Sequence, residues 1–196
     1  MKKIDAEKEI KEIKSMLKET EDEVKKVALS RADYSILWGC IVTTGFLLSM
    51  LLSKLGLYLW MFVMWILVLI IGWLSSHLLS RREFRRTGII TFVGKIESII
   101  WVATSIGILL VMLFGWFSES FNPILIPTIV AILAGNAFFI SSFLFSDKVL
   151  KFSSPIWWIG AILSVIYPGI IFYIFIVLIF FTMIVPGLIT RLTNKV

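Results

Sequence analysis

The sequence contains few of the residues that carry enzyme chemistry. No Asp, Glu, Lys or Arg falls near the middle of any long apolar run. Charges inside a membrane mark proton relays, ion pathways and catalytic centres, so their absence argues against a proton-coupled pump and against membrane enzymes that use paired carboxylates or a metal. The motifs Gly-x-Ser-x-Gly and His-Glu-x-x-His and the phosphate-binding loop are also missing. We therefore expect no enzyme activity, no catalytic residue, no metal site and no cofactor.

Cysteine and histidine are almost absent as well. Cys40 is the single cysteine, which excludes an intrachain disulfide and a zinc site built from several cysteines. His77 is the single histidine, and we expect no special role for it. A cleavable signal peptide would show a short basic segment followed by an apolar one, but residues 1–33 are charged throughout. The first apolar run is therefore expected to act as the insertion signal.

Apolar side chains are what the sequence has in excess. Of 196 residues, 59% are hydrophobic, and the mean hydropathy is +0.96, well above that of an ordinary soluble domain. These residues form runs close to the ~20 residues that cross the hydrocarbon core of a bilayer. The pattern predicts an all-α, polytopic membrane protein, with a cytoplasmic amphipathic helix at 1–33, a six-helix transmembrane domain at 34–190 and a short cytoplasmic tail at 191–196. The predicted spans are 34–53, 57–79, 96–117, 123–145, 149–167 and 169–190.

The last apolar tract is too long for a single crossing. Pro168 disfavours continuation of a helix, and Gly169 permits a turn conformation. We therefore place a tight hairpin at Tyr167-Pro168-Gly169, between the fifth and sixth spans. Pro186 and Gly187 are expected to loosen the last turns of the sixth span.

Basic residues predict the orientation. All but one of the 19 Lys and Arg residues fall on one side of the membrane in this topology, and Lys54 is the exception. Because Lys and Arg near span ends are retained in the cytoplasm, we expect both termini to be cytoplasmic. The net charge of +6 then reflects topology, and no nucleic-acid binding is expected.

Four arginines lie within six positions between the second and third spans: Arg81, Arg82, Arg85 and Arg86. Retention in the cytoplasm is sufficient to explain them. A second interpretation is contact with anionic lipid head groups, and a third is contact with the phosphates of a soluble ligand.

Residues 1–33, which we call the arm, carry nine acidic and nine basic residues and neither Pro nor Gly. Five apolar residues, the arm stripe, follow the 3-4 spacing of a helix–helix seam. The arm stripe consists of Ile10, Ile13, Leu17, Val24 and Val27. A helix that lies on a membrane usually has aromatic residues and a basic polar face, whereas the arm has balanced charge and no aromatic residue. We favour contact with a helix of a second copy or of a protein partner; a position on the lipid surface and a merely solvated helix stay open.

Asn136 is the most polar residue well inside a predicted span. Such an amide usually forms a hydrogen bond with a neighbouring helix, and contact with a permeating solute or a bound lipid is the alternative. Ser141 and Ser142 follow it toward the cytoplasm, and Thr104 and Ser105 are candidates to face them from the third span.

Small residues recur at four-residue spacing, which permits close approach of helices. The pairs are Gly72 with Ser76, Ala103 with Gly107, Ala131 with Gly135, and Gly160 with Ser164. Glu97 lies in the first turn of the third span, where the helix dipole favours an anion. We expect it to pair with Lys95 or with the four arginines.

The layout resembles a group of small prokaryotic multi-span proteins described as hypothetical integral membrane proteins. The similar features are the charged arm, Ala28-Leu29-Ser30 before the first span, the basic loop after the second, the Tyr167-Pro168-Gly169 turn and the Pro186-Gly187 ending. The resemblance implies this fold and a location in the plasma membrane. It supplies no activity and no functional residues.

Three functions are compatible with these features. The first is a non-catalytic membrane protein that acts as an anchor, sensor or interaction partner through its arm. The second is a transporter component or channel for an uncharged or lipid-like solute, suggested by the compact spans and by Asn136, Ser141 and Ser142. The third is a lipid-modifying membrane enzyme, which needs a polar cluster at one interface.

Overall fold

The chain is helical wherever the structure describes a regular element. The computed structural model describes residues 2–87, 92–118, 122, 125–145 and 148–193, but not the side chains of 2–9, 11–13, 15–27, 83–87, 92–93, 145 and 148. The helices are α1 (Lys2–Lys54), α2 (Tyr58–Thr87), α3 (Phe92–Phe117), α4 (Ile126–Phe145), α5 (Lys148–Ile166), α6 (Ile171–Ile179) and α7 (Val185–Thr193). A 3-10 turn, Pro168–Ile170, precedes α6, and a π-helical turn, Phe180–Ile184, joins α6 to α7.

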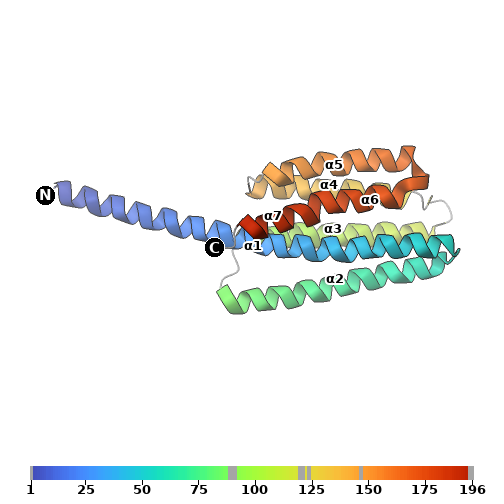
Figure 1. Cartoon of the computed structure of the whole chain (residues 1–196). Helices are drawn as coiled ribbons and strands as arrows, with labels where there is room; N and C mark the ends of the chain where they lie inside the picture. The colour runs from blue at the N-terminus through green and yellow to red at the C-terminus, as the bar shows by residue number, and fades with distance from the viewer. Residues whose placement is uncertain (1, 88–91, 119–121, 123–124, 146–147, 194–196) are drawn as a thin grey trace.

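Six stretches of the described chain are long and apolar enough to cross a membrane, which confirms the prediction of an all-helical, multi-pass membrane protein. They are Ala28–Lys54, Tyr58–Arg82, Gly94–Phe117, Ile126–Leu144, Val149–Ile166 and Pro168–Thr193. The stretches lie side by side in a bundle, from which the first part of α1 projects (Figure 1). We call the end with this projection the arm end, and the opposite end, with the α1–α2 and α5–α6 connections, the turn end.

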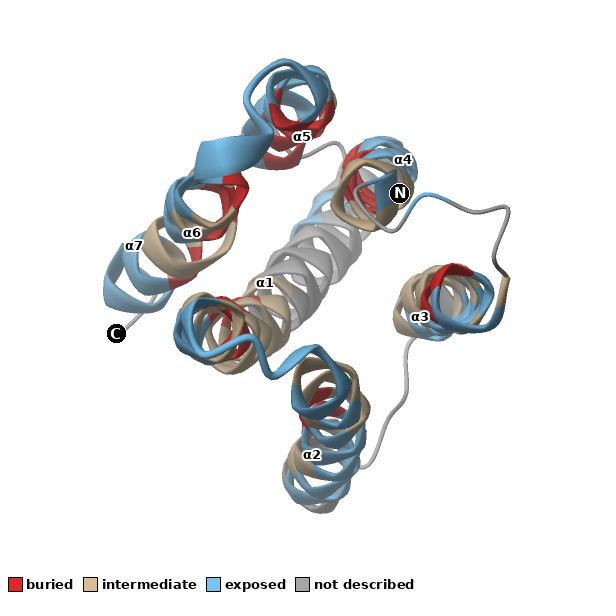
Figure 2. Ribbon diagram, turned by 90° about the vertical axis from the view of Figure 1, so that its right-hand side faces the viewer, coloured by how far each residue is buried: buried red, intermediate tan, exposed pale blue. Residues whose placement is uncertain are grey.

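The first helix continues without a break from the arm into the bundle. α1 covers Lys2–Lys54, so arm and first span form a single rod. In the bundle it lies between α2 on one side and α6 and α7 on the other (Figure 2). Its contact with α7 is close, because a methyl group added at Gly187 would lie 3.0 Å from the carbonyl oxygen of Ala32. α1 therefore contacts helices on both of its sides in the bundle.

The core lies where α1, α4, α5 and α6 meet. Phe175 and Ile179 of α6 are 0% exposed. The Phe175 ring stacks on Phe46 of α1 at a centroid distance of 4.9 Å and meets Trp157 of α5 edge-on at 6.0 Å. Because lipid is as apolar as these side chains, such contacts stabilise the bundle through close packing rather than through removal of water. We call α4, α5, α6 and α7 the tight half, since α6 and α7 belong to one span.

α2 and α3 form a less buried region, which we call the open half. In their apolar spans only 11% of the residues are buried, compared with 44% in α4. α3 packs mainly against α4 and reaches α2 at the turn end through stacked Phe62 and Trp116 rings, 4.8 Å apart. The apolar side chains that the two helices leave exposed are suited to a lipid solvent.

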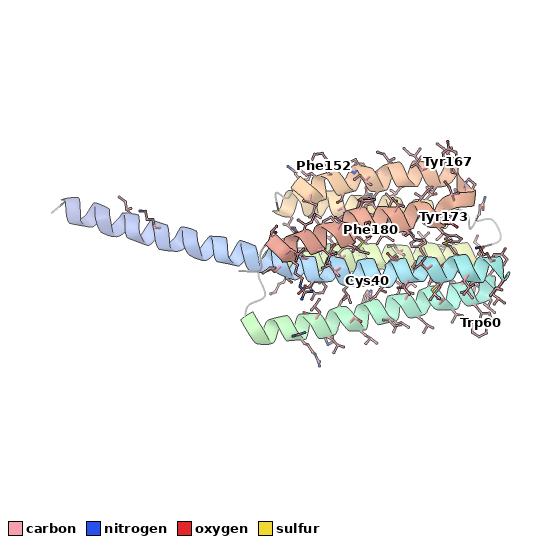
Figure 3. The ribbon with its side chains drawn as sticks, viewed as in Figure 1. Cys40, Trp60, Phe152, Tyr167, Tyr173 and Phe180 are labelled. Carbon is pink, nitrogen blue, oxygen red and sulfur yellow. The ribbon has the colours of Figure 1, made fainter. Side chains whose placement is uncertain are left out.

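Large side chains also point outward around the bundle (Figure 3). Phe152 and Phe180 are 72% and 46% exposed. Trp60 and Tyr167 lie at the turn end, where Figure 3 labels them. Trp and Tyr gather at membrane–water boundaries because one end of each ring system is apolar and the other is polar.

The two connections at the turn end are built differently. Gly56, with φ of 70°, ends α1 in a conformation that favours glycine. The Leu57 amide donates to the Leu52 carbonyl at 2.9 Å, and the Gly56 amide donates to the Ser53 carbonyl at 3.1 Å, as in a Schellman cap. At the α5–α6 hairpin the first residue of the 3-10 turn is Pro168, and its neighbouring glycine is not left-handed.

The last span changes its winding before Pro186. Proline supplies no N–H and disfavours the preceding α-helical turn, and the segment Phe180–Ile184 is π-helical. In such a turn a carbonyl accepts from the amide five residues further on, as Phe180 accepts from Val185. The Ser35 hydroxyl of α1 donates to the Met183 carbonyl at 2.9 Å. The loosened segment is therefore held by a neighbouring helix.

Two of the small-residue pairs accommodate single large side chains. The Trp38 ring of α1 lies over Gly72, and its indole N–H donates to the Ser76 hydroxyl at 2.9 Å. On α5, Gly160 lies directly under Leu178 of α6. Close approach of neighbouring helices was predicted at these positions. In the structure, one large side chain of the neighbouring helix fills the space above each glycine.

Candidate functional site

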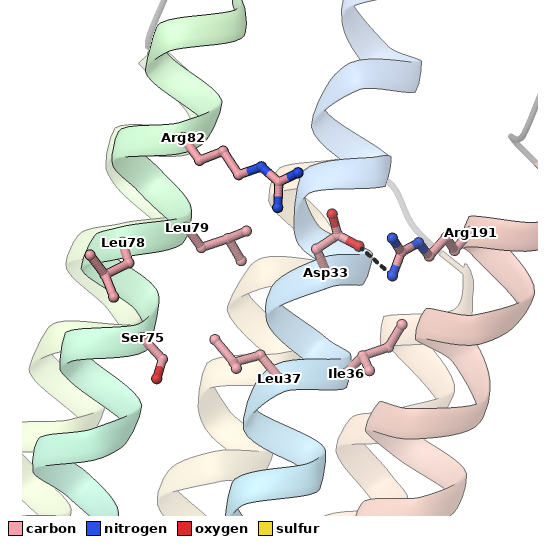
Figure 4. A pocket seen from close by; sticks show the side chains of 8 residues that line it. All are labelled: Asp33, Ile36, Leu37, Ser75, Leu78, Leu79, Arg82 and Arg191. Carbon is pink, nitrogen blue, oxygen red and sulfur yellow. Dashed lines mark ion pairs between the residues drawn. The ribbon is translucent and has the colours of Figure 1, made fainter.

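A cleft opens at the arm end between α1, α2 and α7 (Figure 4). It has a volume of about 470 Å³, in the range of small-molecule sites. Its lining residues are Asp33, Ile36, Leu37, Ser75, Leu78, Leu79, Arg82 and Arg191. Arg82 lies nearest the arm. Asp33, Arg191, Leu78 and Leu79 lie at about one level below it, and Ile36, Leu37 and Ser75 lie deeper along the bundle (Figure 4).

Helical spacing explains why these residues share one cleft. The lining positions on α2 are 75, 78, 79 and 82, and those on α1 are 33, 36 and 37. Residues three, four and seven apart lie on one face of a helix. Each face therefore carries a charged side chain at its arm end, Asp33 or Arg82, followed by leucine or isoleucine side chains and, on α2, by Ser75.

The charges of the cleft are unbalanced. Arg191 Nη1 lies 3.4 Å from Asp33 Oδ1, and the two side chains are 53% and 39% exposed. The Arg82 guanidinium points toward the same place from α2, and no ion pair joins it to another described residue (Figure 4). Among the described residues, Arg191 is thus paired with a carboxylate and Arg82 is not. An exposed ion pair adds at most about 1 kcal/mol of stability. We therefore consider these three residues for the charge that they present to a ligand rather than for their contribution to stability.

The sequence identified only part of this site. Of the four arginines for which lipid contact was the second interpretation, Arg82 lines the cleft, whereas Arg81 is exposed and does not line it. The side chains of Arg85 and Arg86 lie outside the described residues. Arg191 completes the site from the last helix, although it was predicted only to mark topology. Its position at the end of an apolar span, like that of Arg82, was the available signal.

Asn136 has the structural role that was favoured for it. Its side-chain oxygen accepts a hydrogen bond from the Trp158 indole of α5 at 3.2 Å. The neighbouring Gly135 has no side chain, so the Trp158 ring lies directly against α4. The amide therefore links two helices of the tight half.

The other polar residues inside the spans are not brought to a common site. Thr104 and Ser105 donate to carbonyl groups of their own helix, α3, at 2.8 Å each. Ser142 donates to the Phe139 carbonyl of α4 at 2.6 Å. The Ser141 hydroxyl is buried and has no partner among the described residues. None of these residues lines the arm-end cleft.

The arm projects away from the bundle as a helix that begins at Lys2 (Figure 1). Within the arm stripe, Ile10 is 53% exposed. The other four side chains, Ile13, Leu17, Val24 and Val27, lie outside the described residues. Contact of this stripe with another helix stays a prediction.

A second set of charged residues connects α1 with α3 at the arm end. The Glu97 carboxylate interacts with the Arg31 guanidinium of α1 and with the Trp101 side chain. Lys95, one of the two expected partners, is exposed. Pairing of Glu97 with the four arginines stays a prediction, since the side chains of Arg85 and Arg86 lie outside the described residues. Arg31 was not foreseen because it belongs to a helix that is distant in sequence but adjacent in the bundle.

The chain matches no protein family, and no curated protein sequence or solved structure is significantly similar to it. Among the described residues there is also no group of three or more His, Cys, Asp or Glu side chains that could hold a metal ion. What the protein does must therefore follow from its own helices and from the arm-end cleft.

Proposed function

We propose that the protein is a non-catalytic, multi-pass plasma-membrane protein that joins a second copy of itself through the arm. The six-span bundle serves as its anchor and as a sensor coupled to the arm. The observation that carries this proposal is the unbroken course of α1, Lys2–Lys54, from the arm into the bundle. Because α1 contacts α2 as well as α6 and α7, any constraint on the arm acts on a helix that touches both halves of the bundle.

The orientation belongs to the same proposal. Both termini lie in the cytoplasm, as supported by the 18 of 19 Lys and Arg residues on that side of the predicted topology. Reporter fusions after Gly56 and after Val196 test it. An active cytoplasmic reporter is expected only on the second fusion, and the opposite result contradicts the orientation.

A second copy suits the arm better than a membrane surface or a highly charged partner. The arm has nine acidic and nine basic residues, so two identical arms do not repel each other through net charge. The 3-4 spacing of the arm stripe forms a narrow seam, which is the pattern of a two-helix contact. About three heptads are marginal for isolated helices in water, but anchoring both chains in one membrane raises their effective concentration.

The mass of the detergent-purified protein tests this association. We expect a dimer for the full chain and a monomer after removal of residues 1–30. The double variant Leu17→Ala with Val24→Ala alters the arm stripe. The control double variant Lys18→Ala with Lys25→Ala removes two charged residues of the same helix that do not belong to the stripe. Since alanine is a good helix former, both double variants keep the arm helical.

Only the stripe variant is expected to dissociate. A monomeric full chain, or equal dissociation of both double variants, contradicts a stripe-mediated dimer. Capture of a different protein by a chain that stays monomeric also overturns the second-copy proposal. Asn136 and Ser142 have separate hydrogen-bond partners, and neither they nor Ser141 line the arm-end cleft, so no second function is proposed.

A further inference from the structure

We infer that the arm-end cleft binds the head group of an anionic phospholipid. The phosphodiester lies on the guanidinium groups of Arg82 and Arg191, and an acyl chain follows the apolar wall formed by Leu37, Leu78 and Leu79. This inference does not depend on the arm, and it assigns a ligand to a site that the proposed function leaves unused.

The charge of the cleft matches one phosphodiester. Asp33 pairs with Arg191 at 3.4 Å, and among the described residues no carboxylate pairs with Arg82, so the lining residues carry one excess positive charge. A phosphodiester carries one negative charge, and the planar guanidinium presents paired N–H donors that fit its oxygens. A choline head group would bring an additional cation beside the two arginines. A head group without a cation is therefore preferred.

The order of polar and apolar groups identifies the source of the phosphate as a lipid. Arg82 lies nearest the arm, Leu78 and Leu79 lie level with Arg191, and Leu37 lies deeper along the bundle (Figure 4). Leu78 is 67% exposed, so a free phosphate ion would leave this apolar wall uncovered. An amphiphile places its head at the level of the arginines and its chain on the wall, as the bilayer already orients it.

The neighbouring arginine supplies a matched control. Arg81 and Arg82 are adjacent on α2 and both are exposed, but only Arg82 lines the cleft. Diffuse attraction between a basic segment and an anionic membrane depends on total charge. Diffuse attraction is therefore reduced equally by Arg81→Gln and Arg82→Gln. Binding in the cleft is instead weakened by Arg82→Gln and not by Arg81→Gln.

Native mass spectrometry of the full-length protein in detergent measures the binding. The protein is titrated with phosphatidylglycerol, with phosphatidylcholine and with inorganic phosphate. We expect phosphatidylglycerol to bind most tightly. Loss of a hydrogen bond to a charged group weakens binding of phosphatidylglycerol to Arg82→Gln by about tenfold, while Arg81→Gln changes it less than about twofold. Arg82→Lys keeps the positive charge but lacks the paired N–H donors of the guanidinium, and its affinity for phosphatidylglycerol is expected to fall about threefold.

Three results would overturn the inference. Equal losses in Arg81→Gln and Arg82→Gln indicate diffuse attraction. Equal binding of phosphatidylcholine and phosphatidylglycerol removes the preference for an anionic head group. Displacement of phosphatidylglycerol by millimolar inorganic phosphate identifies a site for soluble phosphate. Melting temperatures of the variants verify folding, and the milder Arg82→Lys carries the test if Arg82→Gln unfolds. The Leu17→Ala, Val24→Ala variant is expected to bind lipid normally, which separates this inference from the proposed function.

Discussion

The two halves of the bundle differ in how their helices are held. In the tight half, α6 contributes the fully buried residues Phe175 and Ile179. In the open half, α3 packs mainly against α4, meets α2 through the stacked Phe62 and Trp116 rings at the turn end, and interacts with α1 through Glu97 at the arm end. Helices in lipid gain stability chiefly from close contacts, so the tight half is expected to hold the fold together. The arm-end cleft lies where the two halves meet, between α2 and α7.

The largest expected effect comes from truncation of one phenylalanine in each half. Phe175→Ala removes a ring that is 0% exposed and contacts two aromatic neighbours, so it should lower the free energy of unfolding by about 3 kcal/mol. Phe114→Ala on α3 removes a ring that is 62% exposed and should change that free energy by less than about 0.5 kcal/mol. Unfolding in mixed detergent micelles, followed by circular dichroism, measures both. Similar losses would show that the halves are equally well packed.

Adding one methyl group in each half gives the next largest effect. In Gly187→Ala the new carbon meets the Ala32 carbonyl oxygen at 3.0 Å, and backbone cannot move aside easily, so a loss of about 2 kcal/mol is expected. In Gly107→Ala on α3 the nearest atom belongs to the Leu133 side chain, 3.4 Å away. The same unfolding experiment should find that variant unchanged or slightly more stable, since alanine favours helix. Destabilisation of Gly107→Ala by as much as Gly187→Ala would remove this difference between the halves.

The smallest effect concerns the two connections at the turn end, and here the substitution next to α2 is expected to cost more than the one in the tight half. Gly56 in the α1–α2 connection has φ of 70°, so Gly56→Ala should cost about 1 kcal/mol because L-residues disfavour that region. Gly169 in the α5–α6 hairpin is not left-handed, and a methyl group there would have no neighbour within 4 Å. Gly169→Ala should therefore shift the melting temperature little. A larger shift for Gly169→Ala would mean that the hairpin depends on its glycine rather than on Pro168.

Much of the fold follows from properties that each segment carries by itself. Length and hydropathy depend only on neighbours in sequence, which is why six spans and the turn at Pro168 could be predicted. The pairing of faces depends on the whole bundle. No local sequence pattern indicates that Trp38 lies over Gly72, or that Ser35 supports the π-helical turn.

The cleft shows the same limit. A basic segment near a span end was a sound reason to consider lipid contact, but the choice of Arg82 over Arg81 depends on which face of α2 meets α1. The contribution of Arg191 required the last helix to lie beside the first. The acidic partner of Arg191, Asp33, was counted among the arm charges because sequence alone does not locate the membrane boundary within α1.

The uninterrupted α1 also makes the protein a lever. Its 53 residues correspond to a rod of about 80 Å, of which roughly 40 Å extends beyond the start of the first span. A change of only about 10° in the tilt of that span would swing the free tip through approximately 7 Å. Small adjustments among the packed helices would thus be read out as a large displacement at the tip.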